Sequence, residues 1–308
     1  MNNLEEDKGA AMPHRIICIG EVLWDSLPTG LFPGGAPFNV AIHLHQLKND
    51  VKFVTRVGND ILGVEIVRRM RTHGLPVDYV QMDDDLPTGF VLVESTDPDN
   101  PQYDIKEPAA WDEIELQPGL LEDAEETEAV VFGSLAQRNP TTRKTVYQLL
   151  DTGAPGAFDV NLRPPYDEKE VVEPSLEKSE LVKLNDEELE RLAQWFGIEG
   201  GYEESIRGLA DRFDCRTICV TRGSDGATLF HEGSFHEHQG YDVTTVDAVG
   251  AGDAFLAGLL TKLLDEDSSP ADALEYANVL GAYVVTCSGA TPSVDSQGLE
   301  RVRATSAP

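Results

Sequence analysis

The sequence predicts an α/β fold, in which a doubly wound, mainly parallel sheet has helices on both faces and carries a small β lid. Short apolar runs alternate with amphipathic stretches of helical period along most of the chain, a pattern typical of a parallel sheet covered on both faces. No internal repeat and no linker rich in Pro, Gly or Ser divides the chain. One segment near residue 90 breaks the alternation and has the pattern of a hairpin.

Short apolar runs predict the strands of the main sheet. They occupy residues 15–20, 51–57, 129–132, 157–160 and 217–221. Apolar residues at helical spacing predict helices between and after these strands. The helices occupy residues 39–46, 61–73, 140–150, 186–196, 203–213, 252–264 and 271–286. Gly74 ends the second helix as a C-terminal cap, and the last helix begins directly after Pro270.

The hairpin is predicted from residues 88–95 and 102–106, with a turn at 97–101. A second extended stretch, about residues 21–33, follows the first strand. The two stretches can pair into a small sheet outside the main layer. Such a sheet is either an edge decoration or a lid over a cleft, and the sequence alone leaves both open. We expect residues 1–14, which are polar and acidic, to be a disordered leader and residues 15–308 to form one domain.

Composition limits the possible functions. The formal net charge of −31 disfavours nucleic acid as a partner, because phosphates repel an acidic surface. No apolar run reaches the roughly 18 to 20 residues of a membrane span. The first residues lack the basic start and apolar stretch of a secretory signal. Four scattered cysteines are interpreted as free thiols, so we expect a cytoplasmic protein.

The strongest local motif is DAVGAGD at residues 247–253, followed directly by an apolar helical stretch. Gly250, Ala251 and Gly252 let the backbone approach an anion closely, and the free amides of a helix N-terminus favour negative charge. Asp253 lies in the first turn, where its carboxylate can take a proton from a hydroxyl that attacks phosphorus. Asp is also a common helix cap, but a cap does not require the small residues before it. We therefore predict an anion hole with Asp253 as the catalytic base.

A second glycine-rich turn, TRGSDG, begins at the end of the strand at 217–221. Thr221, Gly223 and Gly226 belong to it, and such turns can present backbone donors to phosphates, although many are purely structural. The chain has no GxxxxGK[ST] motif, which excludes a P-loop enzyme. No GxGxxG follows the first strand, which disfavours a Rossmann dehydrogenase.

Polar residues near the N-terminus predict a binding site for a polyol. Gly34 and Gly35 lie in the segment PGGAPFN, which opens a helix, and Asn39 offers both a donor and an acceptor. Asp25 follows the first strand, at the edge where open α/β sheets bind ligands. A turn residue is the alternative interpretation for Asp25 and a helix N-cap for Asn39, and the residues alone leave both open.

Two further segments carry candidate ligands. Asn161 and Arg163 follow the strand at 157–160, and the guanidinium can neutralise phosphate or hold substrate oxygens. Asn185 and Glu188 lie three residues apart, on one side of a predicted first helical turn, and can hold Mg²⁺ through waters. An acid-rich helix start is the alternative for this second pair.

Together these motifs resemble the ribokinase-type (PfkB-type) carbohydrate kinases. The residues DAVGAGDAF resemble the family's C-terminal signature and GGAPFNVA its glycine pair, while GE…WD, FDVNLRP, N-x-x-E and TRGSDG follow in the family's order. The resemblance covers about residues 15–293. It implies a ribokinase-like fold with a β lid, ATP with Mg²⁺ as cofactors, and transfer of the γ-phosphoryl group of ATP to a primary hydroxyl of a sugar.

The resemblance also implies roles for individual residues. Asp253 is the base, Gly250, Ala251 and Gly252 form the anion hole, and Asp25, Gly34, Gly35, Asn39 and Arg163 contact the sugar. The nucleotide is bound by Asn161, Asn185, Thr221, Gly223, Gly226 and Asn278, the last near the adenine. Glu188 holds Mg²⁺ through water. A monovalent cation, K⁺, is implied beside the anion hole, at Asp247, Val249, Val284, Cys287, Gly289 and Ser293. Members of the family often form homodimers through the lid.

Within the family the motifs look most like those of fructokinases, so D-fructose is the expected substrate. The alternatives are kinases of 2-keto-3-deoxygluconate, ribose or a nucleoside, and a sugar-binding protein without turnover. Phe38 is bulky where a small residue is frequent in the family, and we expect it to reshape the sugar site. Fold alone does not fix a substrate.

The acidic charge allows two interpretations, a halophile's solvating coat or an ordinary acidic protein, and we favour the first because the excess is spread along the chain. Salt screens repulsion between like charges. We therefore expect the thermal midpoint or the activity to rise between dilute buffer and molar KCl. Thermal unfolding followed by circular dichroism across a KCl series measures this, and a flat response contradicts the halophile interpretation.

Overall fold

The computed structural model describes residues 13–27, 30–94 and 102–305. Within these ranges the chain forms one large sheet and one small sheet, which confirms the predicted fold class. Most of the expected leader and the expected turn at residues 97–101 lie outside the described residues. The single domain over residues 15–308 and the disordered leader stay predictions.

The large sheet has the strand order β13-β12-β11-β10-β9-β8-β1-β4-β5. Its strands are β1 Arg15–Ile19, β4 Asp50–Gly58, β5 Val80–Asp83, β8 Ala129–Gly133, β9 Gly156–Asp159, β10 Leu181–Asn185, β11 Thr217–Thr221, β12 Ala227–His231 and β13 Ser234–His238. Neighbours from β5 through β11 pair in parallel. The pairs β11–β12 and β12–β13 are antiparallel, so only this edge departs from a parallel sheet.

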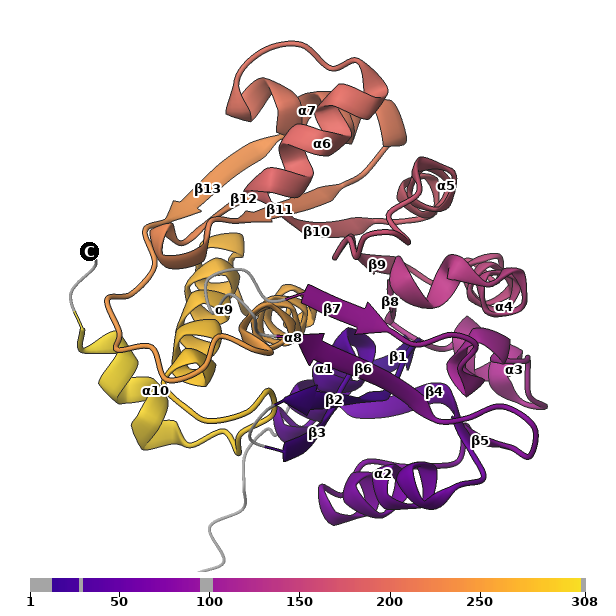
Figure 1. Ribbon diagram of the computed structural model, residues 1–308. Helices are drawn as coiled ribbons and strands as arrows, with labels where there is room; N and C mark the ends of the chain where they lie inside the picture. The colour runs from indigo at the N-terminus through magenta and orange to yellow at the C-terminus, as the bar shows by residue number, and fades with distance from the viewer. Residues whose placement is uncertain (1–12, 28–29, 95–101, 306–308) are drawn as a thin grey trace, which may run out of the picture.

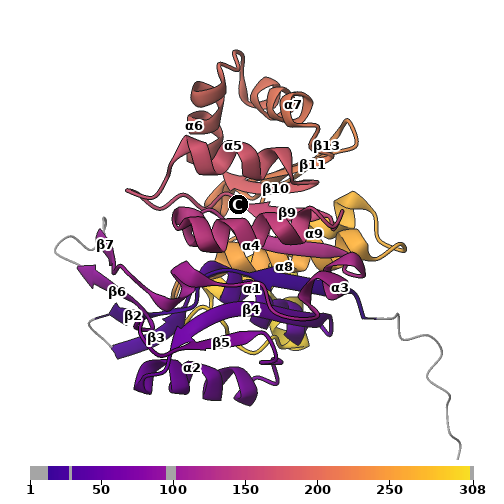
Figure 2. The same cartoon turned by 90° about the vertical axis from the view of Figure 1, so that its right-hand side faces the viewer.

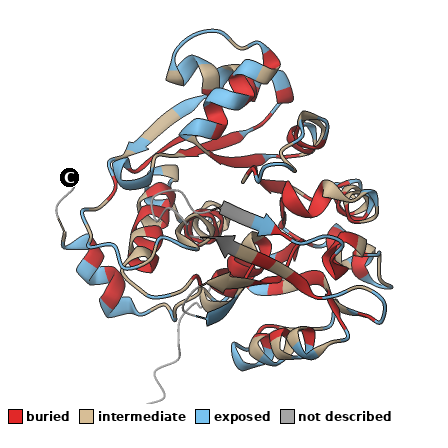
Figure 3. Cartoon of the chain, viewed as in Figure 1, coloured by how far each residue is buried: buried red, intermediate tan, exposed pale blue. Residues whose placement is uncertain are grey.

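Helices cover both faces of this sheet (Figures 1 and 2). One face carries α1 Ala36–Gln46, α2 Ile61–Thr72, α8 Ala251–Leu264 and α9 Pro270–Val285, with α10 Ser296–Arg303 packed on α9; the other carries α3 Leu120–Glu125, α4 Pro140–Leu150, α5 Lys169–Glu177, α6 Asp186–Phe196 and α7 Tyr202–Phe213. Strand β1 serves both cores, because Ile17 and Ile19 join one apolar cluster and Ile16 and Cys18 join the other. Figure 3 shows the central strands buried and the outer helix faces exposed.

The four cysteines are free thiols, as expected, and three of them are buried. Among the described residues, no helix combines the length and the apolar character needed to cross a bilayer.

The small sheet confirms that the two extended stretches pair with each other. It has the order β3-β2-β6-β7, with β2 Leu23–Leu27, β3 Gly30–Gly34, β6 Gly89–Glu94 and β7 Gln102–Ile105. Strand β2 joins the two hairpins by pairing in parallel with β6. This sheet is called the lid below, and its first hairpin, β2–β3, follows β1 directly in the chain and leads directly into α1 (Figure 1).

Several elements were not predicted, and each has a weak signal. The apolar run of β10 is interrupted by Lys183, and helix α5 contains Pro174. Strand β13 is partly exposed along its length, so it lacks a clear apolar pattern. Burial and neighbouring strands stabilise these segments more than their local sequence does.

A buried arginine joins the lid to the core. Arg138 lies between the rings of Trp111 and Tyr166, with its guanidinium carbon 4.0 Å and 4.7 Å from the two ring centres. Its Nε and Nη2 donate to the carboxylate of Asp112 at 2.7 Å and 2.8 Å. Nη2 also donates to the carbonyl of Lys106, which follows β7. The ion pair therefore holds the end of the last lid strand.

We expect Arg138→Met to lower the free energy of unfolding by about 3–5 kcal/mol, because it leaves Asp112 buried without its partner. Denaturant unfolding measures this. Arg15→Met is the control: the pair of Arg15 with Glu126 is more than half exposed, and its loss should cost less than about 1 kcal/mol. Equal effects of the two substitutions would contradict a special role for the buried pair.

Candidate active site

The predicted base and the predicted sugar-binding segment meet near the carboxyl end of β1. Strand β1 lies between β4, which follows it in the chain, and β8, which comes later. The strand order therefore reverses at β1, and open α/β sheets bind ligands at such a point. Helices α1 and α8 begin near this edge and pack against each other (Figure 1).

One hydrogen bond joins the two halves of the predicted site. The Nδ2 of Asn39, on α1, donates to the Oδ2 of Asp253, on α8, at 2.8 Å. The two residues are 214 positions apart in the chain. The predicted base and the predicted sugar segment are therefore neighbours. Asn39 is not the N-cap of α1, which is Gly35, so the structural alternative for Asn39 is wrong.

The N-terminus of α8 has the features expected of an anion site. Gly250 is the N-cap, with a φ of 80°, and no side chain caps the helix. Asp253 therefore does not act as a cap, and the first-turn amides are free of side-chain acceptors. A Cβ on Gly250 would lie 2.4 Å from the carbonyl oxygen of Ala290. Glycine is required here by both its φ and this close approach.

Helix α1 also contacts Ala290. The Nε2 of His43 lies 2.9 Å from that carbonyl oxygen, and since a carbonyl can only accept, Nε2 donates. Burial lowers the pKa of His43 to about 4. The imidazole is therefore neutral near pH 7 and acts as a structural donor.

Gly34 and Gly35 pack against the segment that follows β1. A Cβ on Gly34 would lie 2.2 Å from Oδ2 of Asp25, and one on Gly35 would lie 2.5 Å from the carbonyl oxygen of Glu21. Gly35 has a φ of 108°. The glycine pair thus lets the start of α1 approach both acidic residues. Asp25 is part of strand β2, so the turn alternative for Asp25 is wrong.

Three carboxyl groups share this edge, and burial is the main cause that raises the pKa of each. The pKa of Glu21 rises to about 7, and those of Asp25 and Asp253 rise to about 6. Arg163, which is exposed, opposes the rise at all three residues. Perturbed carboxyls that cluster in this way are typical of functional sites.

Phe38 does not shape this edge. Its side chain is buried in the core, and its ring centre lies 5.9 Å from that of Phe53 on β4. The expectation that Phe38 reshapes the sugar site is therefore wrong, because the residue faces the sheet.

Two buried charges of the site were missed from the sequence. The Nζ of Lys183, on β10, lies 3.1 Å and 3.2 Å from the carboxylate oxygens of Asp159, at the end of β9. The side chains are 10% and 4% exposed. A Cβ on Gly252 would lie 3.1 Å from the same Nζ, so this ammonium lies against the first turn of α8. The sequence does carry one signal for this pair, a single lysine within an apolar run. A charged side chain in a buried strand requires a partner of opposite charge.

Asn185 and Glu188 form a capping box at the start of α6. The Oδ1 of Asn185 accepts from the amide of Glu188 at 2.8 Å, and Oε2 of Glu188 accepts from the amide of Asn185 at 2.9 Å. Oε1 of Glu188 accepts from the amide of Leu162 at 2.7 Å. A carboxylate offers about four acceptor positions, so Glu188 can still accept from metal-bound waters. The residue thus fits a water-bridged Mg²⁺ while it also holds the helix start.

Asn161 and Asn278 each make a hydrogen bond within the fold. Asn161 has a φ of 37°, and its carbonyl oxygen accepts from Ser134 Oγ at 3.4 Å. Asn278 is buried in α9, where its Nδ2 donates to the carbonyl of Leu274 at 2.8 Å.

The TRGSDG turn follows β11 as expected. Thr221 donates to the carbonyl of Leu184 at 3.4 Å, and Gly223 is exposed. Gly226 has a φ of 79°, and a Cβ there would lie 2.0 Å from the carbonyl oxygen of His238. The fold itself therefore requires a glycine at position 226.

The residues expected at the monovalent cation lie on two paired loops. Asp247 accepts from the amide of Val249 at 3.0 Å and from the amide of Gly289 at 3.1 Å. The amides of Val246 and Asp247 donate to the carbonyl of Val285. The structure thus brings Asp247 next to the loop that contains Cys287 and Gly289. In the described ranges, no cluster of three or more His, Cys, Asp and Glu side chains could hold a metal.

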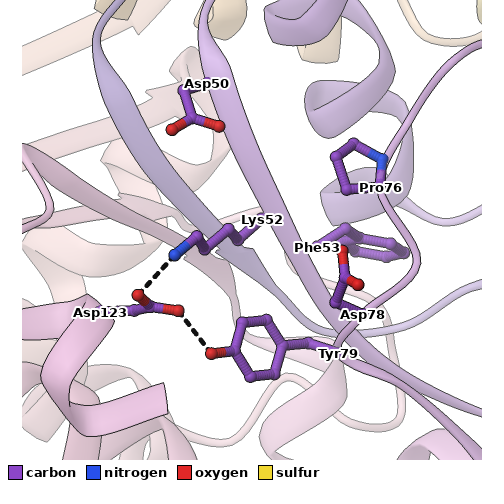
Figure 4. A pocket seen from close by; sticks show the side chains of 7 residues that line it. All are labelled: Asp50, Lys52, Phe53, Pro76, Asp78, Tyr79 and Asp123. Carbon is purple, nitrogen blue, oxygen red and sulfur yellow. Dashed lines mark hydrogen bonds and ion pairs between the residues drawn. The ribbon is translucent and has the colours of Figure 1, made fainter. Parts of the chain in front are cut away.

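A separate pocket of about 340 Å³ lies near the amino ends of the strands, away from these residues (Figure 4). It is lined by Asp50, Lys52, Phe53, Pro76, Asp78, Tyr79 and Asp123. Asp123 pairs with Lys52 and accepts from the hydroxyl of Tyr79. Since the register places Asp50 beside Arg15 at the start of β1, this pocket is at the opposite edge from Asp253.

Known proteins resemble this chain over nearly its whole length. The model of the pfkB family carbohydrate kinases matches residues 27–297. A fructokinase of Escherichia coli is 29% identical, over 91% of this chain and 95% of that protein. A 2-dehydro-3-deoxygalactonokinase of Haloferax volcanii is 30% identical, over 87% of this chain and 86% of that protein.

Solved structures agree with this result. A double mutant of the fructokinase of Vibrio cholerae, with fructose, ADP and potassium bound, has a TM-score of 0.80 at 25% identity, over 94% of this chain and 98% of that chain. A sugar kinase of Pyrococcus horikoshii has a TM-score of 0.78 at 27% identity, over 94% of this chain and 100% of that chain. Motifs, fold and comparisons all agree, and the chain belongs to the pfkB family of carbohydrate kinases.

Proposed function

We propose that this protein transfers the γ-phosphoryl group of ATP to a primary hydroxyl of a sugar, with D-fructose as the substrate and Asp253 as the base. The hydrogen bond between Asn39 and Asp253 is the main support. It joins the segment suited to a polyol with the helix N-terminus suited to a phosphoryl group. The fructokinase relatives, and the fructose and ADP in the Vibrio cholerae structure, favour this substrate pair.

The reaction follows from these groups. As the sugar oxygen attacks the γ-phosphorus, its proton passes to the carboxylate of Asp253. The new oxygen–phosphorus bond forms while the bond to the β–γ bridging oxygen breaks, and ADP leaves. The first-turn amides at Gly250, Ala251 and Gly252 stabilise the charge on the transferring group. Asn39 orients the carboxylate through its N–H donor.

The sugar hydroxyls would contact Asp25, Asn39 and Arg163, on the segment that Gly34 and Gly35 bring close. The nucleotide phosphates would lie along Thr221, Gly223 and Gly226, with Asn161 and Asn185 near them and Asn278 toward the adenine. Mg²⁺, held through water by Glu188, would neutralise charge on the phosphates. K⁺ would lie at the paired loops of Asp247 and Gly289, and the potassium in the Vibrio cholerae structure supports that ion.

A 2-keto-3-deoxy sugar acid is the second candidate substrate. One relative of this kind is 30% identical to this chain. The exposed guanidinium of Arg163 could pair with the carboxylate of such an acid. Fructose has no carboxylate, so the two candidates differ in what they require of Arg163.

We expect Asp253→Asn to lower the rate of phosphoryl transfer by about 10²- to 10⁴-fold, because the base is lost. A coupled ADP-release assay across hexoses, pentoses, keto acids and nucleosides, at low and high KCl, measures both the rate and the substrate. A near wild-type rate in this variant would refute the base. A wild-type protein that phosphorylates nothing in the panel would instead be a sugar-binding protein.

Gly34→Ala should raise the KM for the sugar at least roughly tenfold, because the new Cβ displaces the Asp25 carboxylate and a hydrogen bond to a charged group is lost. The KM for ATP should change little. Gly133→Ala is the matched control, since a Cβ there meets only the carbonyl of Asp159, at 3.5 Å. Steady-state kinetics with each substrate varied distinguishes these outcomes. Equal KM values for the sugar in the two variants would show that Asp25 does not contact the sugar.

Two further expectations stay predictions, namely a homodimer formed through the lid and a cytoplasmic location. The interpretation of the acidic charge as that of a halophile also stays a prediction, and it rests on composition.

A further inference from the structure

A buried ion pair lies directly beneath the predicted anion hole. The ammonium of Lys183 comes within 3.1 Å of the position that a Cβ on Gly252 would occupy. Asp159 holds this ammonium through both carboxylate oxygens. The two residues are on the adjacent strands β9 and β10, so the sheet fixes the position of the charge.

The charges around this pair do not balance. Asp159, Glu188 and Asp253 all interact electrostatically with Lys183, so three carboxyl groups surround one ammonium. Burial weakens screening by water, and such interactions are stronger than at the surface. Lys183 is therefore a cation that the sheet holds in place within this cluster. Gly252 is small enough to let the Lys183 ammonium approach α8.

We propose that Lys183, fixed by Asp159, is a positioning residue that supplies a permanent positive charge beneath the anion hole and favours the charged form of Asp253. The proposal rests on Asp253 as the catalytic base. Lys183 stabilises the charged form of this carboxylate, whereas Asp159 destabilises it. The pair therefore adjusts the pH below which the base is lost, in addition to the larger effect of burial. The same charge attracts the phosphoryl group above the helix.

Other groups also face Asp253. Asn39 donates to it from α1, and Arg163 lowers its pKa from the segment after β9. Glu21, at the end of β1, interacts with it electrostatically. Glu188, at the start of α6, acts on Lys183. These groups are unchanged in the variants below, so a difference between the variants reports the ion pair.

The test is the pH profile of kcat/KM for the sugar, at saturating nucleotide, for Lys183→Met, Asp159→Asn and the double variant. Activity falls as pH drops through the pKa of the base, near 6 in the unaltered protein. Lys183→Met should move this acid limb up by about one pH unit and Asp159→Asn should move it down. The double variant should lie between the two. Ionisation of the nucleotide is common to all of them and cancels in the comparison.

The control is Arg138→Met, which breaks an ion pair of similar burial, 6% and 5% exposed, away from Asp253. It should lower stability and leave the acid limb in place. An acid limb that stays fixed, or that moves in the same direction in both single variants, overturns the proposal. If Lys183→Met does not fold, the acid limbs of Asp159→Asn and of the double variant still test the proposal, because Asp159→Asn alone should move the limb further down than the double variant does.

Failure of the proposed function is distinguishable from failure of this inference. An active Asp253→Asn protein refutes the base itself. An inactive Asp253→Asn protein, together with unmoved acid limbs in the other variants, refutes only the role of Lys183.

Discussion

The approach of α8 to α1 determines the rest of the site. The two helices begin at the same edge of the sheet, and the contact between Asn39 and Asp253 joins them. Small residues permit the contact, because a side chain at Gly250 would strike Ala290 and one at Gly252 would press on Lys183. Bulk at either position would displace the start of α8 from these neighbours. The glycines of the motif are thus required by packing as well as by room for an anion.

The site also shows how burial prepares acidic groups for chemistry. Glu21, Asp25 and Asp253 lie where water is partly excluded, and the pKa of each rises for that reason. A base works best when its pKa is near the working pH. Arg163 and Lys183 limit the rise at Asp253. The fold therefore adjusts the pKa of Asp253, the proposed base, by placing few cations among several carboxyl groups.

Much of this could be predicted from the sequence, for identifiable reasons. The spacing of apolar residues and the positions of turn residues predicted the central strands, most helices and the two parts of the lid. Glycine motifs indicated Gly34, Gly35 and Gly250, because each needs a close approach or an unusual φ. Lys183 and Asp159 were missed since their partnership depends on the neighbouring strands β9 and β10. Phe38 was misjudged because sequence does not tell which side of α1 faces the sheet.

The position of helix α1 affects two contacts of the site at once. Asn39 and His43 are four residues apart, hence on one side of the helix. The first contacts the start of α8, and the second contacts Ala290, which closes against Gly250. Any displacement of α1 would therefore disturb the contact at the start of α8 and the contact at Ala290 together. One side of a single helix therefore carries the contact to Asp253 and the contact to the loop that adjoins Gly250.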